Sequence, residues 1–482
     1  MFRAEGVRRN VSPKPVVCTL APKERSGRSF SMIFEPDFEC LAPDALRALQ
    51  DRRLRDLVSY VTTRVPFYRD RLAARGVTTA DIRSVADITR LPITRKTDLR
   101  DHYPFGLLAV PRASLRRVHG SSGTTGKPTI VAYTAKDLDL FERVTARSLA
   151  MAGAEPGMML HNAYGYGLFT GGLGIHGGAE RLGMNVIPVS GGMTDRQVTL
   201  IEDLRPDVLT CTPSYALTLA GALAERGLAP DDISLRFSIH GAEPWTDAMR
   251  THIDAGLGVR CTNIYGLSEI IGPGVSCECV EGRDGSHIME DHFFPEILDP
   301  DTGAPLPDGT DGVLVLTTLT KEALPLLRYW TGDITSITRE PCRCGRTLAR
   351  MRMIRGRTDD MLIIRGVNVY PSQIEEVLAR MPELSPYFRI VVSRDQHLDH
   401  IEVHCEVSPA WASASGFSAL PADAVEAHDA HEASLALRAG VIARLHETLA
   451  VSVRVRLLGV GEGPRSDGAK VQRVVDRRPK SV

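Results

Sequence analysis

HGSSGTTGKPT, residues 119–129, is the segment around which the rest of the chain can be understood. It contains three glycines, and it places four hydroxyl side chains and one lysine before a proline. Glycine adopts the positive-φ conformations that let backbone N–H groups converge on an anion, while hydroxyls and an ammonium add donors and charge. A Walker P-loop does not fit, because Lys127 is followed by proline. A Gly/Ser/Thr linker is the alternative, but a linker needs no lysine, and we predict a polyphosphate-binding loop.

The composition is that of a globular protein with more than one domain. The 482 residues exceed the usual length of one domain, and 43% hydrophobic with 24% charged residues are typical of a soluble protein. The formal net charge of -1 gives no electrostatic case for binding nucleic acid or a membrane. No apolar run approaches the roughly 18 residues of a membrane span. We therefore expect a cytoplasmic protein that binds neither nucleic acid nor membrane.

The order of predicted elements indicates an α/β fold with two domains. Between 155 and 270, short apolar runs alternate with helical stretches, which is typical of a parallel or mostly parallel sheet with crossover helices. Turn signals and strand patterns between 285 and 340 predict an antiparallel β subdomain. The charged, glycine-containing junction at 355–360 is expected to be a hinge. The segments beyond it predict a small, mobile α+β domain.

The domain boundaries follow from these patterns. Residues 1–31 are basic and lack the apolar core and cleavage site of a signal peptide, so we predict a disordered leader. The large N-terminal domain then covers 32–357, with mixed or parallel sheets, crossover helices and the β subdomain. The small C-terminal domain covers 358–482, with its hinge near Asp359. Residues 408–432 show no periodicity, and we expect them to form an exposed insertion.

Cysteine and lysine usage bears on the chemistry. Nine cysteines in a chain without an export signal indicate reduced thiols or a metal site, and not a disulfide framework. Lysine is rare, with eight among the 58 basic residues. In so arginine-rich a chain, we expect a lysine at a special position to be there for its chemistry.

Several motifs, taken together and in this order, resemble one family, the phenylacetate–CoA ligases of the adenylate-forming enzymes. The similarity runs from about residue 40 to the end, and the leader and residues 408–432 fall outside it. The matching segments are Ser121–Thr129, Asn162–Gly172, Gly241–Thr246, Tyr265–Glu269, Gly272–Gly274, His287–Pro295 and Arg357–Glu376.

This resemblance implies an acid–thiol ligase that works in two half-reactions. A carboxylate first attacks the α-phosphorus of ATP, giving acyl-AMP and pyrophosphate. The thiol of coenzyme A then displaces AMP, and the small domain rotates between the two steps. Because a carboxylate and a triphosphate repel each other, the reaction needs Mg²⁺ and a cation at the reacting centre.

The resemblance also implies which residues hold the nucleotide. Those expected at the β- and γ-phosphates are Ser121, Ser122, Gly123, Thr124, Thr125, Gly126 and Lys127. Those expected beside adenine are Gly241, Ala242 and Glu243, with Tyr265 stacking on the base. Asp333 is expected to accept both ribose hydroxyls, because a carboxylate offers two acceptor atoms to a diol, and Arg357 is its companion.

Two residues are implied to be catalytic. Glu269 resembles the residue that helps to hold Mg²⁺, although a carboxylate at a surface helix start is the alternative. Lys470 resembles the mobile lysine that bridges the acid carboxylate and the α-phosphate. A solvated C-terminal lysine is the alternative there, and the scarcity of lysine favours the catalytic role.

A separate group of cysteines predicts a structural zinc site. A C-x-C pair followed by glycine is typical of a metal knuckle, and thiolates with one imidazole form a closed tetrahedral site. Four reduced thiols beside a coincidental histidine are the alternative. Cys277 would be a fifth ligand and is left out. The predicted ligands are Cys279, His287, Cys342 and Cys344.

The sequence leaves alternatives for the acid substrate and for the acceptor of the acyl group. Tyr164, Phe169 and Pro273 are predicted to form an aryl wall, with His240 as a polar contact. Aromatic residues and a glycine-lined entry favour a flat acid over a fatty chain. Phenylacetate is the family's default acid, and a hydroxy- or aminobenzoate of secondary metabolism is the alternative. The acyl group could also pass to a carrier-protein thiol, an amine or a hydroxyl, and a non-catalytic nucleotide sensor is a further alternative. Relatives suggest a homodimer.

Overall fold

The computed structural model describes residues 32–121, 128–358, 360–365, 367–395, 398–417, 432–467 and 471–478. Its first part is a layer of helices, α1 (Pro36–Glu39), α2 (Pro43–Arg64), α3 (Pro66–Ala74) and α4 (Lys96–Asp101). Prolines start the first three of these helices, where the missing N–H would have no partner in the helix. Among the described residues, no helix has the length and apolarity needed to cross a membrane.

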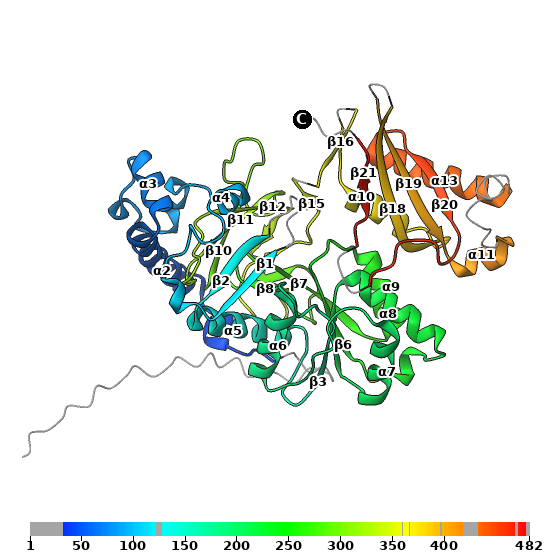
Figure 1. Cartoon of the computed structure of the whole chain (residues 1–482), viewed down its shortest axis with the longest axis horizontal. Helices are drawn as coiled ribbons and strands as arrows, with labels where there is room; N and C mark the ends of the chain where they lie inside the picture. Colours follow the sequence, from blue (N-terminus) through cyan, green and yellow to red (C-terminus); the bar gives the residue numbers. More distant parts are fainter. Residues whose placement is uncertain are drawn as a thin grey trace, which may run out of the picture. The chain divides into compact units, whose positions relative to one another are not determined.

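A nine-stranded sheet forms the centre of the large domain (Figure 1). Its order is β13-β14-β9-β8-β7-β6-β5-β3-β4. The five strands from β4 to β7 are parallel, and the remaining neighbours are antiparallel. This confirms the predicted mixed sheet. The strands are β3 (Met159–Asn162), β4 (Asn185–Ile187), β5 (Val208–Cys211), β6 (Phe237–His240), β7 (Arg260–Leu267), β8 (Gly272–Glu278), β9 (Ser286–Ile288), β13 (Ile337–Thr338) and β14 (Arg350–Met351).

Helices cover both faces of this sheet. Successive residues of β5 belong to different hydrophobic clusters, because side chains alternate across a strand. Val208 packs with α5 (Ala135–Met151) and α6 (Gly171–Leu182). Leu209 packs with the second group, which consists of α7 (Thr194–Leu204), α8 (Pro213–Glu225) and α9 (Asp247–Leu257). The result is a three-layer α/β/α arrangement.

Glycines let α5 and α6 approach closely. A Cβ atom at Gly174 would lie 2.2 Å from the Phe141 ring, and one at Gly178 would lie 2.5 Å from Thr145 Cβ. Real Cβ atoms do not approach that near, so larger residues would push the helices apart. The close contact fixes α6 and therefore the segment 164–172 that precedes it.

Two smaller sheets complete the large domain. An antiparallel sheet with the order β10-β11-β12-β15 agrees with the predicted β subdomain. The hairpin of β1 and β2 carries the predicted phosphate-binding loop at its turn. The strands are β1 (Arg117–Ser121), β2 (Thr129–Tyr133), β10 (Phe293–Leu298), β11 (Gly312–Thr318), β12 (Tyr329–Thr335) and β15 (Gly356–Arg357).

The C-terminal elements form a sheet with a hydrophobic cluster of its own. The sheet order is β20-β19-β18-β21, and the cluster takes its buried residues from 362–457. The boundary between 357 and 358 stays a prediction, as does the leader, which lies outside the described residues. The elements are β16 (Leu362–Ile364), β17 (Val367–Val369), α10 (Pro371–Ala379), β18 (Leu384–Asp395), β19 (Leu398–Val407), α11 (Pro409–Ser415), α13 (Glu432–Leu449), β20 (Arg454–Leu458) and β21 (Val474–Asp476).

The first part of the expected exposed insertion at 408–432 contains a helix that its lack of periodicity did not predict. Residues Pro409–Ser415 form α11, which Ser408 caps by accepting a 3.3 Å hydrogen bond from the Trp411 N–H. Gly416 ends the helix at φ +70°, and Phe417 is buried in the C-terminal cluster. Serine, then proline, then a closing glycine is a helix signal that composition alone obscured.

Candidate active site

A cleft opens where the parallel strands β6 and β7 end. Ligands bind at the carboxyl ends of such strands in open α/β sheets. The loop after β6 and the second half of β7 supply one side, and β12, β15 and the segment before β15 supply the other. The lining residues are Gly241, Ala242, Glu243, Pro244, Trp245, Asn263, Ile264, Tyr265, Gly266, Leu267, Asp333, Met353, Ile354 and Arg357. Six of the residues predicted to bind the nucleotide are therefore brought together here.

The loop after β6 has a backbone that its sequence makes possible. A Cβ atom at Gly241 would lie 2.1 Å from the carbonyl oxygen of Ile264, so only glycine fits between the two strands. Ala242 follows with a positive φ of 71°, which turns the chain into the cleft. The carboxylate of Glu243 accepts a 2.6 Å hydrogen bond from the Ser214 hydroxyl and a 2.9 Å bond from the Val471 N–H. Val471 directly follows Lys470, so these bonds tie the predicted adenine loop to the C-terminal segment.

Asp333 lies at the centre of the opposite side. It is 4% exposed and stands across from Arg357 in the ladder of β12 and β15. Its Oδ1 accepts a 2.5 Å bond from Arg357, and its Oδ2 accepts a 2.6 Å bond from the Tyr265 hydroxyl. Burial and the nearby Asp333 charge raise the pKa of Tyr265 well above its usual value, so Tyr265 is a neutral donor. Tyr265 is thus joined to the predicted ribose acceptor, and its stacking on adenine stays a prediction.

Glu269 is a buried carboxylate with two lysines beside it. It is 4% exposed, and Lys96 Nζ lies 3.8 Å from its Oε1. Lys321 Nζ donates a 2.8 Å bond to its backbone carbonyl. Burial lowers the pKa of Lys321 to about 8, against the raising effect of Asp137 and Glu269. Neither lysine was predicted to belong to the site, although the rarity of lysine in this chain was a signal that could have found both.

The stem of the predicted phosphate-binding loop carries unpaired hydroxyls. Ser121 ends β1 directly across from Thr129 at the start of β2. Within the described ranges, the buried side-chain oxygens of both residues have no hydrogen-bond partner. Such donors at the mouth of the hairpin suit an anion. The remaining predicted loop residues, Ser122, Gly123, Thr124, Thr125, Gly126 and Lys127, lie outside the described residues, as do Asp359 and Lys470.

The residues predicted for the acid pocket differ in their burial. Tyr164 is buried and Phe169 is 40% exposed, and both rings flank Gly171, where a Cβ atom would lie 3.4 Å and 2.5 Å from them. Pro273 lies on β8 and is half-buried. His240 is fully buried instead. Its Nε2 bonds to the Ser238 hydroxyl at 2.8 Å and its Nδ1 to the Cys211 carbonyl at 3.1 Å. Burial lowers the pKa of His240 to about 4, so the ring is neutral.

The four predicted metal ligands form one compact cluster. Their ligand atoms all lie within 4.8 Å of one another. Cys279 Sγ lies 3.5 Å from Cys342 Sγ, and Cys344 Sγ lies 3.4 Å from His287 Nε2. The other ring nitrogen of His287 lies 3.3 Å from the Leu348 carbonyl oxygen, a contact that fixes ring orientation in metal sites. Cys277 is buried apart from this cluster, with its thiol directed to the Glu278 carbonyl.

Comparison with known proteins defines the class. The family model described as "AMP-binding enzyme" matches residues 118–319, and that of the "AMP-binding enzyme C-terminal domain" matches residues 366–478. A solved structure of 2-hydroxyisobutyryl-CoA ligase, in the postadenylation state with an acyl-AMP, gives a TM-score of 0.82 at 29% identity, over 92% of this chain and 91% of that chain. Fold and site together therefore define an adenylate-forming enzyme.

Sequence relatives identify the family. The phenylacetate–coenzyme A ligase of Thermus thermophilus is 60% identical over 93% of this chain and 100% of its own length. That of Escherichia coli is 47% identical over 91% and 97%. The chain belongs to the phenylacetate–coenzyme A ligase family. It is an AMP-forming acid–thiol ligase, which activates an acid with ATP and transfers the acyl group to coenzyme A.

Proposed function

We propose that the acid is aromatic, a phenylacetate-like acid or a substituted benzoate, and that the cleft around Asp333 binds ATP for its activation. The names of the two bacterial relatives support the phenylacetate side of this proposal. The observation that carries the ATP-binding part of the proposal is the arrangement of the predicted ribose acceptor, Asp333. Two carboxylate oxygens of Asp333 are held by Arg357 and Tyr265 at the edge of a cleft that Gly241 and Ala242 close from the other side.

The chain's own residues account for the first half-reaction. The ribose hydroxyls bind Asp333, and the β- and γ-phosphates bind the loop between Ser121 and Thr129. Glu269 is the proposed protein ligand for Mg²⁺, which would neutralise phosphate charge. A buried carboxylate with Lys96 Nζ at 3.8 Å fits that role, because carboxylate oxygens are ligands that Mg²⁺ prefers in proteins. Lys470 is proposed to stabilise the charge that develops at the α-phosphate. The bond between Glu243 and Val471 supports this role, because it holds the neighbour of Lys470 at the adenine loop.

Pyrophosphate release tests the acid. The purified chain receives MgATP and, one at a time, phenylacetate, hydroxy- and aminobenzoates and a medium-chain fatty acid. We expect release with the aryl acids and none with the fatty acid. Release with the fatty acid alone would contradict the proposal. Product mass with coenzyme A and with a carrier protein then separates the acceptors, and light scattering tests the proposed homodimer.

Asp359 is the proposed hinge between the two half-reactions. Asp359→Pro should slow thioester formation more than adenylation, because proline fixes φ and restricts the preceding residue. Single-turnover measurements of acyl-AMP and of acyl-CoA separate the two steps. Equal losses in both would count against a hinge at this position.

We also propose that Cys279, His287, Cys342 and Cys344 hold a structural zinc ion. Zn–S bonds of about 2.3 Å and Zn–N bonds of about 2.0 Å in a tetrahedron place ligand atoms about 3.5–3.8 Å apart. The Sγ–Sγ distance of 3.5 Å lies at the lower end of this range, and the Sγ–Nε2 distance of 3.4 Å lies just below it. A Cβ atom at Gly282 would lie 3.0 Å from Cys279 Sγ and 3.3 Å from Cys342 Sγ, so glycine leaves room for the cluster. Elemental analysis should find one zinc per chain, and its absence from protein purified without chelator would refute the proposal.

A further inference from the structure

Two thiols of the Cys/His cluster differ in how well solvent reaches them. The sulfur atoms of Cys279 and Cys342 lie 3.5 Å apart. Cys279 is 1% exposed, whereas Cys342 is half-buried and lies between two exposed residues on the surface loop 341–347. An oxidant in solution therefore reaches Cys342 first, and a second thiol is in contact with the sulfur that it attacks.

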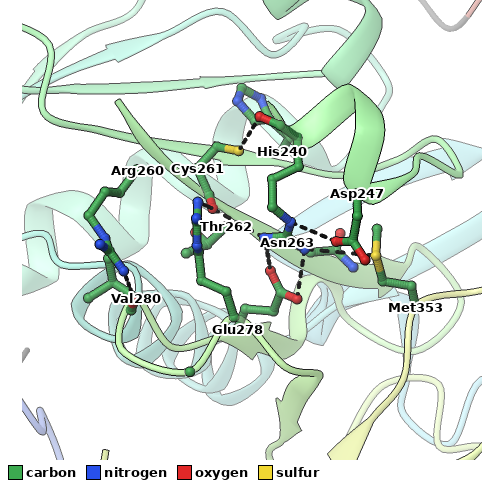
Figure 2. A network of polar contacts seen from close by, with 12 residues as sticks. His240, Asp247, Arg260, Cys261, Thr262, Asn263, Glu278, Val280 and Met353 are labelled. Carbon is green, nitrogen blue, oxygen red and sulfur yellow. Dashed lines mark hydrogen bonds and ion pairs between the residues drawn. The ribbon is translucent and has the colours of Figure 1, made fainter. Parts of the chain in front are cut away.

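The main chain on both sides of Cys279 is anchored. Before it, the Glu278 carboxylate forms bonds of 2.8 Å and 3.0 Å with the Arg250 guanidinium (Figure 2). After it, the Val280 carbonyl accepts a 2.7 Å bond from Arg260 (Figure 2). Because the residues on both sides are fixed, the Cys279 sulfur has little freedom to move. A reaction that draws the two thiols together must therefore displace the second thiol and its loop.

The same loop holds the first described segment of the chain. Arg346 donates a 2.5 Å bond to the Glu39 carboxylate, and neither side chain is exposed to solvent. The Thr347 N–H donates a 3.1 Å bond to the Glu39 carbonyl, and the Thr347 hydroxyl donates a 2.7 Å bond to the Leu41 carbonyl. A displacement of the loop therefore strains or breaks the contacts that hold residues 32–41.

We propose that Cys279 and Cys342 are a modification site at which a hydroperoxide forms a reversible disulfide, releases zinc and loosens residues 32–41. The Cys342 thiolate attacks the peroxide and becomes a sulfenic acid, and the other peroxide oxygen takes up a proton and leaves as water or an alcohol. The Cys279 thiolate then attacks the oxidised sulfur, the S–S bond forms, and hydroxide leaves and is protonated. Two electrons pass from the thiols to the peroxide, and a dithiol reductant reverses the change by thiol–disulfide exchange.

Disulfide formation and zinc binding exclude each other. The thiolate is the form of cysteine that binds a metal, so a bonded pair of sulfurs leaves only Cys344 and His287 as ligands. The two sulfur atoms must also approach from 3.5 Å to about 2.05 Å. Since Cys279 is anchored, the loop carries this movement. The disulfide itself needs no metal, and only the measurement of zinc release rests on the proposed zinc site.

Peroxide treatment of the wild-type chain is the direct test. The full chain, purified under reducing conditions, is titrated with hydrogen peroxide, and its peptides are mapped by mass spectrometry. We expect a Cys279–Cys342 disulfide, loss of the bound zinc over the same peroxide range, and recovery of both thiols after dithiothreitol. A disulfide between other cysteines, or oxidation of Cys342 without a disulfide, would overturn the proposal.

Hydrogen exchange measures the displacement of the loop. Backbone amides of residues 32–41 should exchange about tenfold faster in the oxidised chain, as expected for a loss of local stability. Residues 54–72 are the internal reference, because their apolar side chains belong to the main hydrophobic cluster. Unchanged exchange at 32–41, or equal acceleration in both segments, would contradict a local effect of the disulfide.

Variants of single thiols check the assignment. Cys40→Ser and Cys277→Ala each remove a thiol outside the cluster, and the Cys40 sulfur lies 3.6 Å from the Gly345 carbonyl of the same loop. Both variants should form the disulfide as the wild-type chain does. Cys342→Ser should form none, and if it does not fold, the peptide map of the wild-type chain decides. Loss of the disulfide in Cys40→Ser would assign the reaction to the wrong thiol.

Two outcomes separate this inference from the zinc proposal. If elemental analysis finds no zinc but peroxide joins Cys279 to Cys342, the modification site stands and the zinc site fails. If zinc is present and stays bound while both thiols remain reduced, the modification site fails and the zinc site stands. Neither outcome bears on the activation of an acid by ATP.

Discussion

The nucleotide cleft and the Cys/His cluster both gather polar side chains within the large domain. They differ in whether those side chains surround one closed position or line an open space. In the cluster, Cys279, His287 and Cys344 are buried, and the ligand atoms converge on one point. In the cleft, Asp333 and Asn263 are nearly buried, yet they line an open space. A closed ligand set suits an ion that stays, and an open one suits substrates that exchange. The comparison teaches that burial of polar groups does not by itself separate a structural site from a reactive one.

Asp333→Asn should give the largest effect, and it should act on activity. Asparagine keeps the shape but loses the charge, and it offers only one acceptor to the two ribose hydroxyls that Asp333 is proposed to bind. We expect acyl-AMP formation to fall by about 100- to 1000-fold with little change in melting temperature. Asp308→Asn is the control, because Asp308 is an exposed carboxylate paired with Arg339. An equal fall in the control, or only a twofold fall at Asp333, would contradict the proposed role of Asp333.

Cys344→Ser should show the opposite profile. Removing one thiolate from the proposed zinc site should lower the free energy of unfolding by at least about 3 kcal/mol, since loss of a metal is among the most destabilising changes. The activity of molecules that remain folded should stay within a few fold. Denaturant unfolding and zinc content measure the two parts. Cys277→Ala is the matched control, because it removes a buried thiol outside the cluster and should retain zinc.

The pH dependence of the free energy of unfolding should reveal the lowered pKa of the buried His240, which belongs to neither site. Its folded pKa of about 4 lies below the unfolded value of about 6.5, so the unfolded chain binds more protons between these values and stability falls as pH falls. Between pH 7 and pH 5, this histidine alone should remove about 2 kcal/mol. His240→Gln should lack that part of the loss. Identical pH profiles for the two proteins would mean that the pKa of His240 in the folded state lies close to its unfolded value.

Glu243→Gln should have the smallest effect, and it tests the contact between the edge of the cleft and the C-terminal segment. Glutamine keeps an acceptor for Ser214 but weakens the bond to the Val471 N–H. Loss of one charge-assisted bond predicts about a 3- to 10-fold slower adenylation at unchanged stability. Single-turnover acyl-AMP formation measures it. An unchanged rate would show that the contact with Val471 does not support the first half-reaction.

Much of the fold was predictable because it depends on local patterns. Alternating apolar runs and helices indicated the parallel strands, and turn signals indicated the β subdomain. The Cys-x-Cys pairs predicted the Cys/His cluster, because the short spacing within each pair is typical of a metal knuckle. These pairs come together although Cys279 and Cys342 lie 63 residues apart in the sequence. Motifs also predicted the cleft residues, since loops that follow parallel strands meet at one edge of the sheet.

Other features depend on long-range packing and could not be predicted. Lys321 donates to the Glu269 backbone carbonyl across 52 positions of sequence, and Lys96 reaches the carboxylate of the same residue from α4. No local sequence pattern predicts that either lysine contacts Glu269. His240 was predicted as a substrate contact, but its place in β6 directs the ring toward Cys211 and Ser238. Which face a strand residue takes is set by register, and one sequence of four residues does not fix it.

The contact between Gly241 and the Ile264 carbonyl has a consequence for changing this enzyme. One wall of the nucleotide cleft is main chain packed against main chain, so side-chain substitution there has almost no freedom. The rings of Tyr164 and Phe169, by contrast, project from a segment whose neighbours at Gly165 and Gly167 have open space around them. A mutant library that aims at new acid substrates should therefore vary residues 164–169 and leave residues 241–242 unchanged. The acid specificity can then change while ATP remains the nucleotide substrate.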